Sequence, residues 1–138
     1  MQITVEDVTP FTVTNPFSWP QGSSQTIAWE VGQTNNGTIN CQNVNIKLST
    51  DGGLTFPTVI ALNAPNIGTF TYTVPAIPNT NNARILIEAA DNIFYDVSDF
   101  NFSISTEPDF FITEETLLPI NCNETSATFT FNYVALNG

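Results

Sequence analysis

The side chains best suited to site chemistry are four oxygen donors in one short stretch of the chain, AADNIFYDVSD. They are Asp91, Asn92, Asp96 and Asp99. Hard cations such as calcium bind several oxygen ligands from carboxylates, amides and carbonyls, so this stretch is a candidate calcium site. Glu6 and Asp7 could approach it from the amino-terminal strand. The alternative is structural, because Asp and Asn also form turns and cap their own backbone.

A second cluster lies in KLSTDGGLTFP, which contains the Ser-x-Asp-x-Gly-x-Thr-aromatic spacing of an Asp-box. That motif recurs in β-propeller hydrolases that act on sugars, but a propeller needs several copies at a fixed period, and this sequence has no repeat. A single copy predicts a tight hairpin turn in which the glycines take positive φ and Asp51 accepts backbone hydrogen bonds. Ser49 and Thr55 are expected to tie its two sides together, with Phe56 covering it.

The residues needed for catalysis are missing from the sequence. The chain has no histidine, so Ser23 and Ser24 have no imidazole base, and a helical zinc motif with two histidines cannot form. Neither cysteine has a basic cluster nearby. Glycoside hydrolysis requires two carboxylates across a cleft, whereas Asp91, Asp96 and Asp99 share one loop. We therefore expect this chain to be non-catalytic.

Aromatic side chains in predicted loops are candidates for ligand binding. Trp19, Phe94 and Tyr95, together with Phe17, could stack on a sugar or anchor a protein partner. The alternative is that they fill the ends of the core, as such residues often do in a small sandwich. Three triplets also fit the N-glycan acceptor pattern, at Asn36, Asn101 and Asn123. We ascribe these triplets to chance in a sequence rich in Asn and Thr.

The net charge narrows the range of partners. The 138-residue chain has 13 acidic residues and only two basic ones, Lys47 and Arg84, for a formal charge of -11. Such a surface repels nucleic-acid phosphate and anionic lipid headgroups and favours divalent cations or basic partners, although it also suits a merely well-solvated exterior.

No run approaches the ~20 apolar residues that span a bilayer, so membrane insertion is not expected. The start MQITVEDVTP is unlike a signal peptide, and the end NYVALNG interrupts a pattern, so we expect an excised piece of a longer protein.

The two cysteines, Cys41 and Cys122, could form one disulfide. Closing so long a loop would contribute about 4 kcal/mol in the chain-entropy treatment. Alternatively, Cys41 is a single buried thiol and Cys122 pairs with a residue outside this chain. The sequence leaves both arrangements open.

Strand patterning dominates the chain, because apolar and polar residues alternate in segments separated by Gly, Pro and Asn. The segments are ITV, PFTVT, QTIAWEV, NVNIKLS, TVIAL, TFTYTV, ARILIEA and FNFSI. About seven strands in residues 1–105 predict an all-β antiparallel sandwich. Trp29 is expected at the centre of its core, with a hydrogen-bond partner for the indole N–H.

Two further expectations concern the last strand of the sandwich and the residues after it. In FNFSI, Phe100, Phe102 and Ile104 are expected to share one face. Residues 106–138 are expected to be a linker and the truncated start of a second β module, because two strands cannot build a stable core alone.

Three motifs together resemble a known module. They are WPQGSSQTIAWEV with its second tryptophan, VNIKLSTDGGLTFP and DNIFYDVSDFNFSI, and they cover most of residues 15–104. The combination resembles the immunoglobulin-like or fibronectin-III-like accessory module found downstream of the catalytic domain in secreted bacterial reprolysin-like zinc metallopeptidases. Many members of that family carry a second cysteine near the end of the strand ARILIEAADN. Here those positions are Glu88, Ala89 and Ala90, so Cys41 has no disulfide partner within the module.

The resemblance implies an immunoglobulin-like (fibronectin-III-like) sandwich of about seven strands, secreted or at the cell surface. It implies a proteolytic parent whose zinc lies in a separate catalytic domain, with neighbouring domains of the same chain as partners. The expected role is non-catalytic: spacing or docking the catalytic domain, or binding substrate, protein or glycan at the cell surface. The alternatives are an adhesin or carbohydrate-binding module of a bacterial surface protein, and a mechanical spacer without a ligand.

Overall fold

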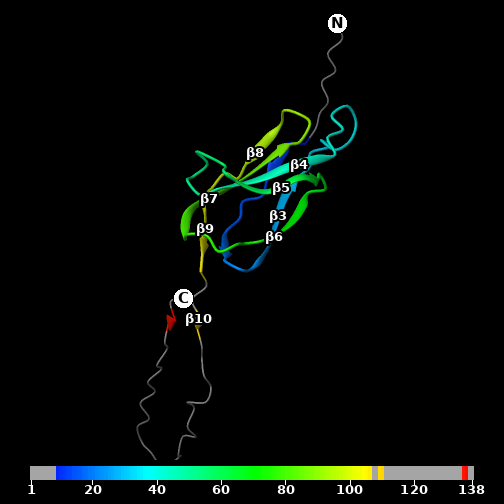
Figure 1. Ribbon diagram of the computed structural model, residues 1–138. Helices are drawn as coiled ribbons and strands as arrows, with labels where there is room; N and C mark the ends of the chain where they lie inside the picture. Colours follow the sequence, from blue (N-terminus) through cyan, green and yellow to red (C-terminus); the bar gives the residue numbers. More distant parts are fainter. Residues whose placement is uncertain (1–8, 107–108, 111–134, 137–138) are drawn as a thin grey trace, which may run out of the picture. The chain divides into compact units, whose positions relative to one another are not determined.

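The computed structural model describes residues 9–106, 109–110 and 135–136, and every regular element in them is a strand (Figure 1). The first nine are β1 (Thr12–Val13), β2 (Ser18–Pro20), β3 (Ser24–Glu30), β4 (Asn43–Ser49), β5 (Thr58–Pro65), β6 (Thr69–Thr73), β7 (Thr80–Ala89), β8 (Tyr95–Val97) and β9 (Phe102–Ser105). The chain divides into two compact units, Met1–Ser105 and Thr106–Gly138. In the second unit, β10 (Asp109–Phe110) pairs antiparallel with β11 (Ala135–Leu136). That this unit begins another β module stays a prediction.

The strands of the first unit form two sheets, as the alternating pattern predicted. One sheet has the order β1-β3-β6, and the other has the order β2-β9-β7-β4-β5, with β8 also paired to β7. Among the described strands of this unit, all pairs are antiparallel except one: β2 runs parallel to β9. The purely antiparallel expectation is therefore wrong at this edge. Parallel pairing needs a long connection, and here nearly the whole unit separates the two strands in sequence.

The core lies between the two sheets because each long strand turns one side inward. β3 contributes Ile27 and Trp29, while β4 and β7 contribute most of the opposite layer. The buried residues from those two strands are Val44, Ile46, Leu48, Ala83, Ile85 and Ile87. Burial of each large aliphatic side chain contributes about 1.5–3 kcal/mol. The central position of Trp29 and the need for an indole partner are both confirmed, since Trp29 Nε1 donates to Asn66 Oδ1 at 2.9 Å.

The Asp-box stretch forms the turn between β4 and β5, as predicted. Gly52 and Gly53 have positive φ, of 79° and 89°. Asp51 accepts from Ser49 Oγ (2.6 Å), from Thr55 N (2.9 Å) and from Thr55 Oγ1 (2.5 Å). The bonds from Ser49 and then Thr55 lower the pKa of Asp51 to about 2. The chemistry of this motif is thus a stabilised carboxylate inside a turn.

Two short strands lie where loops were expected, so the described residues of the first unit form nine strands, whereas about seven were expected in residues 1–105. β2 and β8 have three residues each, too few for periodicity to reveal. The last predicted strand also starts later than expected, at Phe102. The preceding Phe100 is 70% exposed, so it does not share the buried face of Phe102 and Ile104. The predicted strand ITV lies outside the described residues.

Candidate functional site

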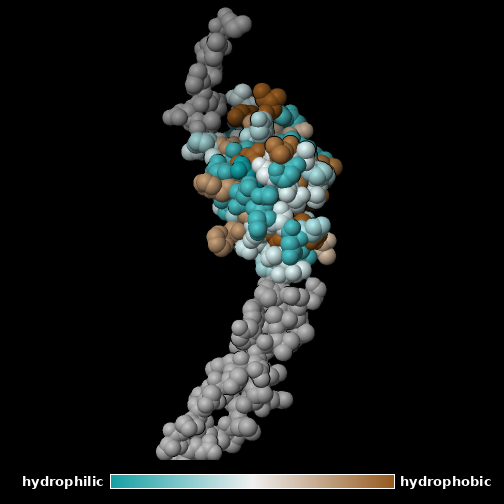
Figure 2. Space-filling view, turned by 90° about the vertical axis from the view of Figure 1, so that its left-hand side faces the viewer, coloured by the Kyte–Doolittle hydropathy of each residue, from teal (hydrophilic) through white to brown (hydrophobic). Residues whose placement is uncertain are grey.

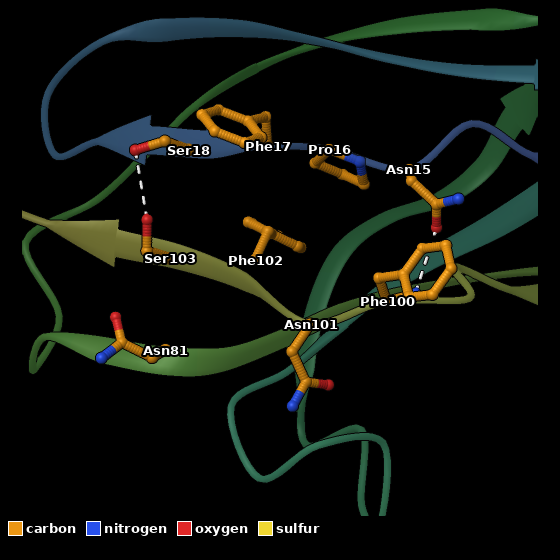
Figure 3. A pocket seen from close by; sticks show the side chains of 9 residues that line it. All are labelled: Asn15, Pro16, Phe17, Ser18, Asn81, Phe100, Asn101, Phe102 and Ser103. Atoms are coloured by element: carbon orange, nitrogen blue, oxygen red, sulfur yellow. Dashed lines mark hydrogen bonds between the residues drawn. The ribbon is translucent and has the colours of Figure 1, made fainter.

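A groove of about 660 Å³ lies on the surface of the described residues. Its two walls are the segment that leads into β2 and the segment that leads into β9, and Asn81 of β7 completes it (Figure 3). The lining residues are Asn15, Pro16, Phe17, Ser18, Asn81, Phe100, Asn101, Phe102 and Ser103. This volume falls within the range of small-molecule sites. The parallel pairing of β2 with β9 is what brings the two segments together.

Two exposed phenyl rings stand at this groove. Phe17 is 92% exposed and Phe100 is 70% exposed. Both residues come just before their strands, where inward and outward alternation does not yet constrain the side chain. In contrast, Phe102 is buried and its ring centroid lies 4.6 Å from that of Trp19 in the core. The groove is therefore apolar, with its base fixed to the core.

Asn15 connects the two walls. Its Oδ1 accepts from the backbone N–H of Asp99 at 2.6 Å and of Phe100 at 3.3 Å, and its Nδ2 donates to Asp99 Oδ2 at 3.3 Å. The hydroxyls of Ser103 and Ser18 form a further bridge at 3.2 Å. These bonds fix the backbone that carries Phe100, so the groove is preformed rather than dependent on a ligand.

The amides of Asn101 and Asn81 differ in how much of their hydrogen-bonding capacity is already used. Asn101 Oδ1 accepts from Arg84 Nε at 2.6 Å, and its Nδ2 donates to Asn82 Oδ1 at 3.3 Å. Asn81 is exposed, and its side chain makes no hydrogen bond to another described residue. The groove thus combines one oriented amide with one amide whose donors and acceptor face solvent.

The described residues that line the groove are all uncharged, although the chain carries a formal charge of -11. Two charged side chains form hydrogen bonds with lining residues: Asp99 accepts from Asn15, and Arg84 donates to Asn101. On the face shown in Figure 2, apolar side chains form small separate groups among hydrophilic ones. Phe17 and Phe100 are exposed rings that line the same uncharged groove.

The predicted ligand-binding aromatics have three different environments. Trp19 is only 3% exposed and packs on Phe102, so it fills the end of the core, which was the alternative interpretation. The partly buried ring of Phe94 meets that of Phe11 edge-on, with 4.9 Å between their centroids. Tyr95 begins β8 and is 67% exposed. Trp19, Phe94 and Tyr95 are not among the lining residues of the groove, so the structure does not bring them together in one site.

The four predicted calcium ligands also have separate surroundings. Asp96 Oδ2 accepts from Val13 N at 2.7 Å, which links β8 to β1. Asp99 bonds Asn15, and Asn92 Oδ1 accepts from the adjacent backbone N–H of Ile93. Among the described residues, no three Asp, Glu, Cys or His side chains come close enough to hold a metal ion. Glu6 and Asp7 lie outside those residues, and calcium binding stays a prediction.

Asp91, the remaining predicted ligand, lies beside Cys41. Cys41 is a buried free thiol whose Sγ contacts Asn43 O at 3.1 Å. Burial raises the pKa of this thiol, and its hydrogen bond with Asp91 raises it further. A protonated, enclosed thiol is a poor nucleophile, in keeping with a structural role. Cys122 lies outside the described residues.

The groove residues that sequence reasoning missed are Phe100 and the asparagines 15, 81 and 101. The alternating pattern of FNFSI predicts that Phe100 shares a strand face with Phe102 and Ile104. Asn15 and Phe100 are 85 positions apart, and no local spacing relates them. These residues can be recognised as one group only when β2 is known to pair with β9, and a strand of three residues is too short for the sequence to reveal that pairing.

No helix that could cross a membrane is found in the part of the chain that the structure describes. Comparison of the chain with known protein families, with curated proteins and with solved structures gave no match.

Proposed function

We propose that this chain is a non-catalytic, immunoglobulin-like module that binds a ligand or partner through the groove rimmed by Phe17 and Phe100. The strand order supports an immunoglobulin-like fold. Strands β3 and β6 pair in one sheet, whereas β4 and β5, which lie between them in sequence, belong to the other sheet. This crossing between sheets is typical of Greek-key sandwiches.

The observation that carries the binding role is the pair of exposed rings at one preformed, uncharged groove. Exposed aromatic rings are costly to leave in water, and they contribute most of the binding energy where they meet a partner. Hydrogen bonds that the backbone N–H groups of Asp99 and Phe100 donate to Asn15 Oδ1 hold the backbone at Phe100 before any ligand arrives. A preorganised site loses less entropy on binding, which favours a recognition role for this surface.

The parent protein is inferred from the sequence motifs. In our proposal the chain is an accessory module of a secreted bacterial metallopeptidase, where it spaces or docks the catalytic domain or holds substrate or cell-surface material. The motif WPQGSSQTIAWEV supplies β2 and β3, and DNIFYDVSDFNFSI supplies β8 and β9. The resemblance therefore rests on residues that build the sandwich. The second candidate is a carbohydrate-binding or adhesin module of a surface protein, which the neutral aromatic groove also favours.

A binding assay on the full chain tests the role. The wild-type protein is expected to be retained by intact bacterial cells or by insoluble protein or polysaccharide substrates. The double variant Phe17→Ala, Phe100→Ala is expected to lose retention. The matched control Tyr95→Ala should keep it, because Tyr95 is nearly as exposed as Phe100 but is not among the lining residues of the groove. Retention that survives the double variant, or no retention on any surface, would contradict the proposal. A zinc-binding HExxH motif encoded upstream in the same reading frame would identify the parent as a metallopeptidase.

A further inference from the structure

The chemistry of the groove suggests which class of ligand it takes, provided that the proposed binding role is correct. The ligand must complement a surface that is acidic overall but neutral inside the groove. A cationic ligand would be drawn to the acidic surroundings yet would find no carboxylate among the described lining residues. An anionic ligand would be repelled by the net charge of the chain. A neutral ligand meets neither objection.

The rings and amides together favour a ligand with one apolar face and a hydroxyl-rich edge. Phe17 and Phe100 offer ring surface on which the C–H face of a pyranose can stack. Asn81 offers an unused carboxamide, and Asn101 retains one unused N–H after its bond to Asn82. A carboxamide both donates and accepts, which matches the hydroxyl group, itself a donor and an acceptor.

A peptide that adds as a further strand is a poorer fit to the same edge. Gln21 N donates to Ser105 O at 2.9 Å, so Gln21 faces β9. Because backbone groups alternate along a strand, Ser18 and Pro20 then direct theirs away from β9. Pro20 has no N–H, and neither has Pro16 two residues before Ser18, so only Ser18 is left to donate to an added strand. Proline at such positions is a known protection of sheet edges.

We propose that the groove binds a neutral oligosaccharide. One or two sugar rings stack on Phe17 and Phe100, and their hydroxyls bond to the amides of Asn81 and Asn101. The inference rests on the proposed binding function and specifies its ligand. Because the ligand is neutral and the described lining residues carry no charge, the affinity should not change with salt concentration.

Calorimetric titration of the full chain tests this assignment with defined probes. The neutral probes are cellohexaose, chitohexaose, mannohexaose and maltohexaose, and the charged probes are heparin and polygalacturonate. We expect at least one neutral probe to bind, with an affinity that is equal at low and high sodium chloride. Phe17→Ala and Phe100→Ala should each weaken binding by about tenfold, which corresponds to about 1.4 kcal/mol. Asn81→Ala should weaken it by less, and Tyr95→Ala should leave it unchanged, while all variants keep the wild-type melting temperature within error.

The possible outcomes separate this inference from the binding role on which it depends. If none of the four neutral probes binds, or if binding survives loss of both phenylalanines, the oligosaccharide assignment is overturned. If retention on a protein substrate needs both rings and no neutral probe binds, the binding role stands and the partner is a protein. Binding limited to the charged probes also overturns the assignment. If the wild-type chain shows neither retention nor oligosaccharide binding, the two proposals are refuted together.

Discussion

Trp29 and Asn66, 37 residues apart in sequence, form a buried hydrogen bond in which the indole Nε1 donates to the amide Oδ1 at 2.9 Å. The amide nitrogen of Asn66 donates in turn to Thr34 Oγ1 at 2.9 Å and to Cys41 O at 3.0 Å. One buried side chain thus links β3, the loop that precedes β4 and the connection between β5 and β6. It satisfies the only polar atom of the central indole ring, which would otherwise be costly to enclose.

Removal of this amide should destabilise the unit markedly. Asn66→Ala leaves the indole N–H and the Cys41 carbonyl without partners, so we expect a loss of about 2–4 kcal/mol in the free energy of unfolding. Urea titration followed by tryptophan fluorescence measures it. The control Asn36→Ala, at an exposed loop position, should change stability by no more than about 0.5 kcal/mol. In a double-mutant cycle with Trp29→Phe, additive losses would contradict direct coupling of the two side chains.

Asp51 should make stability depend on pH in a defined direction. Its pKa is lowered from 3.8 to about 2 by bonds from Ser49 and Thr55, so the folded state favours the charged carboxylate. A lowered folded-state pKa stabilises the protein above pH 3.8, and that contribution is lost as pH falls toward 2. Asp51→Asn should therefore be less stable than wild type at about pH 6, with a difference that shrinks at about pH 3 and below. A difference that stays constant over this whole range would exclude the carboxylate as its cause, and Glu30→Gln, on an exposed side chain, is the control.

Cys41 should resist thiol reagents in the folded protein. The side chain is enclosed, and burial together with Asp91 raises the pKa of its thiol, so both access and thiolate fraction are low. In a Cys122→Ser variant, which leaves a single thiol, we expect slow reaction with Ellman's reagent at about pH 8 and rapid reaction in denaturant. Equal rates in the two conditions would contradict the enclosed position of Cys41.

The predicted calcium site can be tested with a variant of Asp96. Its carboxylate already accepts a hydrogen bond of 2.7 Å from Val13 N, which a metal ion would have to displace. We therefore expect millimolar calcium to leave the melting temperature unchanged, while Asp96→Ala lowers stability by about 1–3 kcal/mol with or without calcium. A calcium-dependent rise in melting temperature that disappears in Asp96→Ala would contradict this expectation and confirm the predicted calcium site.

The parts of the fold that sequence could predict are those governed by long strands and local turns. Ile27 and Trp29 in β3, and the alternating Ile85 and Ile87 in β7, face the core as their period requires. The Asp51 turn is dictated by its glycines and hydroxyls, all within a few residues. These features are decided locally, so their pattern is visible before folding.

The groove could not be predicted because it depends on contacts that are distant in sequence. In the sequence, Phe100 continues the apolar alternation of β9. In the structure, its backbone N–H donates to Asn15 Oδ1, and Phe100 precedes the strand. Trp19 was expected in a loop, but the parallel pairing of β2 with β9 places it in the core beside Phe102. Periodicity carries no information on such pairings, since a strand of three residues shows too few alternations.

The most direct test of the account is a nuclear magnetic resonance titration of the ¹⁵N-labelled full chain with cellohexaose, chitohexaose, mannohexaose and maltohexaose in turn. For at least one sugar, we predict saturable shifts of backbone amides confined to residues 15–18, 81 and 100–103, with the amides around Tyr95 and the Asp51 turn unmoved. Shifts centred on Tyr95, or no saturable shift with any of the four sugars, would contradict the claim that the Phe17–Phe100 groove is an oligosaccharide-binding site.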